Sequence, residues 1–150
     1  ANENINFYEI LNDLQEDFQD RLEDREIDFK NQMTHNYNFI GNRTLIHILI
    51  YNLVINAIKY NRPKGDIVIF DGFENDRYFI SITDSGLGMT DAHLEKIYNR
   101  FARINSDQDG QGLGLAIAES IAFFHHIEIK VVSKINEGTT FTLAFPEAEK

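Results

Sequence analysis

The sequence predicts a single α/β domain in which one mixed sheet of about five strands is covered on one face by three main helices. Three observations support this two-layer sandwich. Apolar residues recur at helical spacing near the start, a long and almost wholly apolar helix follows, and two pairs of alternating segments indicate β-hairpins. Strands and helices that alternate in this mixed order are typical of a sheet with helices packed against it.

Size and composition fit one domain over residues 1–150. The 43% hydrophobic and 25% charged residues are ordinary for a soluble globular protein. The absence of cysteine excludes disulfides, thiolate metal sites and cysteine nucleophiles. The net charge is −10, and residues 1–30 hold ten acidic residues against three basic ones. This balance argues against a nucleic-acid partner, and no apolar run reaches the ~18 residues that span a bilayer.

The first two helices are predicted from their apolar spacing. Residues 7–22 form an amphipathic helix with an acidic outer face, and residues 27–33 alternate weakly, as a strand would. Asn42 can cap a second helix that runs to about Asn61 and is stopped by Pro63 and Gly65. This second helix is apolar nearly all round, so we expect it to be buried.

The remaining elements are two hairpins and a third helix. Strands at 66–73 and 77–84 flank a turn, and strands at 127–134 and 139–145 form the last hairpin. A helix is predicted over residues 113–124. Between the first hairpin and this helix, the stretch from Asp84 to Leu113 is rich in Gly, Asn, Asp and Ser. This composition indicates a mobile segment, which contains one short helix near 91–101.

Two asparagines lie on one face of the apolar second helix. Asn52 and Asn56 are four residues apart, with Lys59 and Tyr60 one turn further on. An unpaired amide in apolar surroundings costs about 2 kcal/mol or more, so both need a partner. The structural alternative to ligand binding is a side chain that ties a neighbouring loop to the core, and this alternative is strongest for Asn52. The oxygen of Asn56 could instead bind a hard cation such as magnesium.

Asp84 ends a predicted strand and is followed by Gly86 and Gly88. The simplest interpretation is a turn started by Asp, with glycines adopting positive φ. Alternatively, the carboxylate lies at the base of a pocket and accepts a hydrogen bond, while the glycines allow a ligand ring to approach the backbone.

A second glycine cluster, Gly110, Gly112 and Gly114, precedes the third helix, so its backbone N–H groups can bind phosphate at a positive helix end. It is neither a Walker A loop nor a dinucleotide fingerprint, since it lacks the Lys-Ser/Thr pair and a strand leading directly into it.

Taken in order, these motifs resemble the ATP-binding catalytic domain of sensor histidine kinases, from the superfamily of gyrase, the large heat-shock chaperone and the mismatch-repair ATPases. The resemblance covers nearly the whole chain and implies a Bergerat-type fold. By this resemblance, Asn56 would bind magnesium and take part in catalysis, and Asp84 would accept a hydrogen bond from the adenine amino group. The implied nucleotide-binding residues are Asn52, Asn56, Lys59, Tyr60, Asp84, Gly86, Gly88, Phe101, Gly110, Gly112, Leu113, Gly114 and Leu115.

Between the glycine boxes, residues 97–103 resemble the phenylalanine box of the nucleotide lid. Phe101 would anchor the lid by packing, and Arg103 would reach the terminal phosphate as a catalytic residue. A surface arginine is the plain alternative. Gln111 stands where the family usually has a small Ser or Thr, which puts the lid geometry in question. Arg62 and Lys64 extend the positive charge of the helix end that carries Lys59.

The resemblance implies a protein histidine kinase that uses ATP and magnesium. The γ-phosphoryl group would pass to a histidine on a separate dimerisation domain, and from there to a response regulator. None of the five histidines here has the setting of that acceptor. The implied location is cytoplasmic, within a larger bacterial sensor that a membrane segment elsewhere could anchor. The alternatives are an ATPase or serine kinase of the same superfamily, or a nucleotide-binding regulator without catalysis.

Overall fold

The computed structural model describes residues 2–95 and 110–147, and for residues 110–114 only the backbone. Its main sheet has five strands in the order β2 (Asp28–Asn31), β4 (Asp66–Glu74), β5 (Arg77–Asp84), β7 (Gly138–Ala144) and β6 (Glu128–Lys134). β2 pairs with β4 in parallel, and every other pair is antiparallel. The predicted mixed five-stranded sheet is therefore confirmed.

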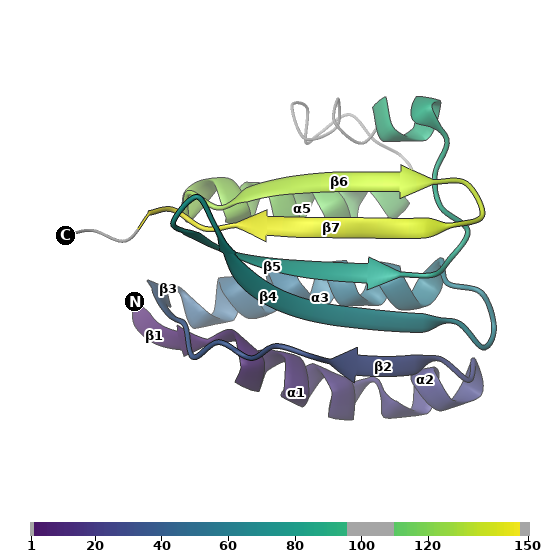
Figure 1. Cartoon of the computed structure of the whole chain (residues 1–150), viewed down its shortest axis with the longest axis horizontal. Helices are drawn as coiled ribbons and strands as arrows, with labels where there is room; N and C mark the ends of the chain where they lie inside the picture. Colours follow the sequence, from purple (N-terminus) through teal and green to yellow (C-terminus); the bar gives the residue numbers. More distant parts are fainter. Residues whose placement is uncertain (1, 96–109, 148–150) are drawn as a thin grey trace.

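Helices cover one face of this sheet. Figure 1 shows α3 (Arg43–Lys59) and α5 (Gly110–Phe124) behind β4, β5 and β7, with α1 (Phe7–Asp17) beside β2 at the sheet edge. Inward strand residues such as Ile69, Ile82 and Leu143 are fully or almost fully buried against this layer. The open face instead carries short polar pairs, in which the hydroxyls of Ser81 and Thr142 lie 3.2 Å apart.

The first predicted helix is two helices. It is interrupted at Phe18, after which α2 (Gln19–Asp24) follows α1, although the predicted apolar residues from Phe7 to Leu22 are all buried. A small antiparallel sheet of β1 (Glu3–Asn6) and β3 (Asn38–Gly41) was not predicted. Its strands are four residues long and lie far apart in sequence, so no local alternation signals their pairing.

Apart from the start of α5, the other elements match their predictions closely. Asn42 caps α3, because its Oδ1 accepts a hydrogen bond from the backbone N–H of Leu45 at 3.0 Å. The β4–β5 turn consists of Asn75 and Asp76, both with positive φ, which suits a tight hairpin. Among the described residues, no helix is both long and apolar enough to cross a membrane.

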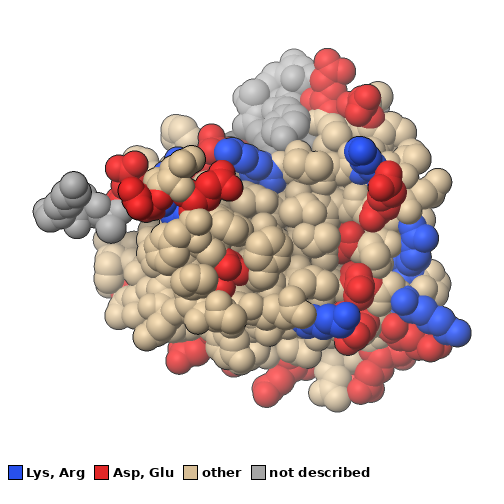
Figure 2. All heavy atoms as spheres, viewed as in Figure 1, with Lys and Arg blue, Asp and Glu red and all other residues tan. Residues whose placement is uncertain are grey.

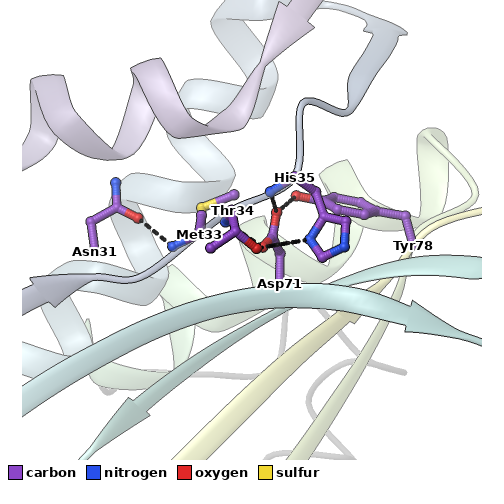
Figure 3. Close-up of polar contacts among 6 residues, drawn as sticks. All are labelled: Asn31, Met33, Thr34, His35, Asp71 and Tyr78. Carbon is purple, nitrogen blue, oxygen red and sulfur yellow. Dashed lines mark hydrogen bonds and ion pairs between the residues drawn. The ribbon is translucent and has the colours of Figure 1, made fainter.

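A buried carboxylate fixes the segment that links the two sheets. Asp71 accepts hydrogen bonds from the backbone N–H groups of Thr34 (2.9 Å) and His35 (3.3 Å) and from the Tyr78 hydroxyl (2.6 Å). The Nδ1 of His35 lies 3.0 Å from the same carboxylate (Figure 3). These contacts hold the chain between β2 and β3 against the middle of β4, where Asp71 pairs with Ile80, four positions from the pair of Ile67 with Asp84.

Charge is unevenly spread over the surface. Acidic side chains gather along the edge formed by α1 and α2, whereas the middle of the open sheet face is largely uncharged (Figure 2). The excess of acid in residues 1–30 is therefore a property of one edge of the domain rather than of the sheet.

Candidate nucleotide-binding site

The second half of α3 carries the predicted Asn52, Asn56, Lys59 and Tyr60. Asn52 is half-buried, and its Nδ2 donates to the Ile48 carbonyl of the same helix at 2.9 Å. The amide of Asn52 thus binds its own helix rather than the neighbouring loop that was the structural alternative. The ammonium of Lys59 is exposed and lies 5.6 Å from the ring centre of Tyr60.

Asn56 is the amide available to a ligand. It is half-buried, and its side chain forms no hydrogen bond within the part of the chain that the structure describes. Its backbone carbonyl accepts from Tyr60 N–H at 3.1 Å, where the helix ends. Because a half-buried amide gains by finding a partner, its oxygen suits an incoming cation or polar ligand.

Asp84 ends β5 and is only 7% exposed. Burial raises the pKa of its carboxyl from 3.8 to about 6, although hydrogen bonds from the backbone N–H groups of Gly86 and Thr139 act in the opposite direction. The Gly86 bond is 2.9 Å long. The turn interpretation is therefore confirmed by the bond from Gly86 N–H. The pocket interpretation, in which this buried acceptor binds a ligand, remains a prediction.

The loop after Asp84 packs tightly against the end of α3. A Cβ added to Gly86 would lie 2.4 Å from the Tyr60 carbonyl oxygen, and one added to Gly88 (φ +71°) would lie 1.9 Å from that of Lys134. Both glycines are thus required by neighbouring protein backbone. The predicted positive φ is confirmed for Gly88, whereas Gly86 is not among the glycines with positive φ. Their contact with a nucleotide remains a prediction.

Helix α5 starts earlier than predicted. It begins at Gly110 rather than Leu113, so Gly110, Gly112 and Gly114 lie within its first turns instead of before it. Local propensity favours a later start, because glycine is a poor helix former, and the structure overrides that preference. Leu115 is buried in the core. The roles of these residues, and of Leu113, in nucleotide binding remain predictions.

The lid residues Phe101 and Arg103 lie outside the described residues, as does the 96–109 part of the segment predicted to be mobile. The described residues at its start are helical over 91–95. Before them, the backbone of Asp84–Met89 is hydrogen-bonded to its neighbours, through Leu87 N–H to Tyr60 O (3.1 Å) and Met89 N–H to Ser133 Oγ (2.8 Å).

Arg62 is exposed, and its guanidinium also binds backbone, a role that the sequence did not predict. Its Nη2 donates to the carbonyl oxygens of Gly86 (3.1 Å) and Asn136 (2.7 Å). Sequence analysis also missed Ser133 and Thr139 of the β6–β7 hairpin, whose hydroxyl oxygens lie 2.7 Å apart in a buried setting. The sequence did contain a signal for them, because both are polar residues at positions where the alternation of the strand predicts a buried apolar side chain.

Comparisons with known proteins show the family to which the chain belongs. Residues 41–149 match the family described as histidine kinase-, DNA gyrase B- and HSP90-like ATPases, so the chain belongs to that family. Within it, the chain is a histidine-kinase ATPase domain of the type found in sensor kinases. It is 31% identical over 97% of its length to the heme sensor protein HssS of Staphylococcus haemolyticus, and 31% identical over 92% to the sensor histidine kinase RppB of Synechocystis.

The chain spans about a third of the length of these two relatives, 32% in each case. Among solved structures, the catalytic domain of histidine kinase ThkA superposes with a TM-score of 0.83 at 25% identity, covering 98% of both chains. The mycobacterial sensor histidine kinase MprB shares the fold, with a TM-score of 0.80 at 23% identity and 97% coverage of both chains.

Proposed function

We propose that this domain binds ATP with magnesium and transfers the γ-phosphoryl group to a histidine on a separate dimerisation domain. The observation that carries the proposal is the junction of Asp84 with the end of α3. Through the hydrogen bond from Leu87 N–H to Tyr60 O, a buried acceptor and the helix that carries Asn56 become parts of one site.

Base recognition follows from the acceptor at Asp84. An ionised carboxylate accepts the hydrogen bond that an adenine amino group offers, whereas guanine carries an oxygen at the same position. Gly86, Gly88 and Tyr60 would border the base, and Asn52 and Lys59 would lie further along the same side. ATP is therefore the nucleotide that this site favours.

The residues present fit magnesium. Asn56 offers a neutral oxygen, and no group of three or more His, Cys, Asp or Glu side chains converges elsewhere in the described ranges. A magnesium ion would therefore be held by Asn56 together with nucleotide phosphates and water, and it would neutralise phosphate charge. The helix start at Gly110, Gly112 and Gly114 offers backbone N–H groups to the phosphates, with Leu113 and Leu115 on the same helix.

In the proposed reaction, the bond from the γ-phosphorus to the bridging oxygen of ADP breaks while a phosphorus–nitrogen bond forms on an imidazole. Lys59 and Arg103 would stabilise the developing charge, and Phe101 would anchor the lid. The domain thus works by positioning and neutralisation rather than as a covalent nucleophile.

The acceptor histidine is expected on another domain. His125 is buried, with Nδ1 donating to the Ile121 carbonyl (2.8 Å) and Nε2 accepting from Asn42 N–H (3.1 Å), so both of its nitrogens are engaged. His35 is bound to Asp71. The full-length protein is thus proposed to be a bacterial two-component sensor with this domain on its cytoplasmic side, which passes phosphate on to a response regulator.

Phosphotransfer tests the proposal. Incubated with labelled ATP and magnesium, the domain alone should bind nucleotide but acquire no acid-labile phosphohistidine. Adding the protein's own histidine-bearing domain as a separate polypeptide should restore transfer, slowly, because tethering normally supplies effective concentrations near ~1 mM. Stoichiometric phosphorylation of the lone domain on its own histidines would contradict the proposal. ATP hydrolysis or serine phosphorylation without histidine transfer would favour another member of the superfamily.

A further inference from the structure

The Asp84–Met89 loop is held between two supports. On one side is the end of α3, where Tyr60 O accepts from Leu87 N–H at 3.1 Å. On the other is the β6–β7 hairpin, where Asn136 N–H donates to Leu87 O at 2.7 Å and Ser133 Oγ accepts from Met89 N–H at 2.8 Å. The loop that begins with Asp84 therefore takes its position from two elements distant in sequence.

Arg62 joins these supports across the loop. It lies three residues after the end of α3, and its Nη2 donates both to Gly86 O in the loop (3.1 Å) and to Asn136 O in the hairpin (2.7 Å). Hydrogen bonds from a charged donor are roughly twice as strong as neutral ones. The guanidinium thus contacts backbone on both sides of the site.

Close backbone contacts leave the Asp84–Met89 loop little freedom to move independently of its two supports. A Cβ on Gly86 would lie 2.4 Å from Tyr60 O, one on Gly88 would lie 1.9 Å from Lys134 O, and one on Gly138 would lie 2.0 Å from Asp84 O. Because backbone meets backbone directly at all three positions, a shift of either support displaces the loop, and the Asp84 carboxylate moves with it.

We propose that Arg62 is a positioning residue for base recognition, which fastens the Asp84–Met89 loop to the end of α3 and to the β6–β7 hairpin. The inference rests on the proposed function, in which Asp84 binds adenine, and adds to it the device that fixes Asp84 in place. Two roles for Arg62 can be told apart by ligand affinity. An arginine that positions the base site affects the affinity of every adenine ligand, whereas one that contacts phosphate affects only ligands that carry phosphate.

Calorimetric titration with adenosine, ADP and ATP, each with magnesium, distinguishes these roles in Arg62→Gln. Because Arg62 is exposed to water, we expect a moderate loss, about three- to tenfold in affinity, by the same factor for all three ligands. The matched control is Arg77→Gln, which removes an arginine whose Nε donates to Phe145 O at 2.7 Å, at the far end of β5. Arg77→Gln should leave all three affinities unchanged.

A loss confined to ADP and ATP, with adenosine binding unchanged, would show that Arg62 acts on phosphate and would overturn the proposal. Equal affinities in wild type and Arg62→Gln would overturn it as well. Ser133→Ala provides a second route, since it removes another contact between the hairpin and the same loop. It should weaken the three ligands by one common factor.

Hydrogen exchange tests the same device without any ligand. In Arg62→Gln, the backbone N–H groups of Leu87 and Asn136 should exchange faster than in wild type, while the N–H groups of the α3 interior keep their protection. Unchanged exchange at both positions would overturn the positioning role of Arg62. A wild-type domain that binds no nucleotide would instead reject the proposed function, and the exchange experiment would still test the role of Arg62.

Discussion

Asp71 and Asp84 lie on the same face of the sheet, Asp71 in the middle of the β4–β5 pair and Asp84 at one end of it, and their pKa values shift in opposite directions. Burial raises the pKa of both carboxyls. At Asp71, hydrogen bonds from Tyr78, Thr34 and His35 outweigh burial, so its pKa is lowered. At Asp84, two backbone N–H groups do not, and its pKa rises to about 6. The ionised Asp71 stabilises the fold, whereas the ionised Asp84, which we propose binds adenine, costs the fold stability.

That cost can be measured by replacing Asp84. A carboxyl whose pKa is raised from 3.8 to about 6 contributes stability below the unfolded value, and this is lost as the pH rises through 6, by about 3 kcal/mol at most. Asp84→Asn should therefore raise the free energy of unfolding at pH 8 by about 1–3 kcal/mol, measured by urea denaturation. At pH 3.5 the gain should vanish. A variant less stable than wild type at pH 8 would contradict this account.

Adenine binding should depend on the ionisation of Asp84. As the pH falls from 7 to 5, the carboxyl takes up a proton and loses its role as a pure acceptor, so ATP affinity should decrease in calorimetric titrations. Asp84→Asn should bind ATP weakly and without this dependence. The unmodified domain should also prefer ATP to GTP, and equal affinities for the two would show that Asp84 does not recognise the base.

Asn56→Ala should abolish magnesium-dependent ATP binding while the fold survives, because the polar group is removed together with its need for a partner. Asn52→Ala is the comparison, since the Nδ2 of Asn52 already bonds the Ile48 carbonyl. It should weaken ATP binding less, and ATP binding should still require magnesium. Titrations with and without magnesium measure both, and unchanged magnesium-dependent affinity in Asn56→Ala would remove this residue from the metal site.

Tyr78→Phe should destabilise the domain by about 1.5–3 kcal/mol, because it removes a buried hydrogen bond to a charged carboxylate. Tyr37→Phe is the matched control, since its ring stacks on Tyr78 at 4.0 Å, yet its hydroxyl forms no hydrogen bond within the described chain. Neither variant should alter ATP affinity, because both residues lie away from Asp84. Equal unfolding midpoints in urea for the two variants would contradict the importance of the Asp71 bond.

Acid should reduce the stability that the hydrogen-bonded carboxylate of Asp71 contributes. A carboxyl with a lowered pKa contributes stability above its unfolded value, and that contribution is lost as the pH falls through its folded value. Protonation of Asp71 therefore lowers the free energy of unfolding, whereas protonation of Asp84 raises it. Of these two groups, only Asp71 still titrates in Asp84→Asn, so the stability of this variant should fall more steeply below pH 5 than that of wild type. Urea denaturation from pH 7 to pH 3 measures the difference.

Much of the fold was predictable because its signals are local. Asn42 caps α3 through its own side chain, and the turn at Asn75 and Asp76 needs only residues tolerant of positive φ. Asn56 and Asp84 could be selected as well, because a polar residue in an apolar helix or before glycines stands out without any knowledge of tertiary contacts.

The sequence by itself determined the class of the domain, its five main strands and the order of the motifs proposed to bind nucleotide, since each depends on residues within a few positions of one another. Only the tertiary structure decided the pairing of β1 with β3, the early start of α5 and the backbone contacts of Arg62. The physical reason is that these depend on contacts between segments far apart in the chain. The guanidinium of Arg62 meets a carbonyl 74 residues away, and no local pattern encodes that partner.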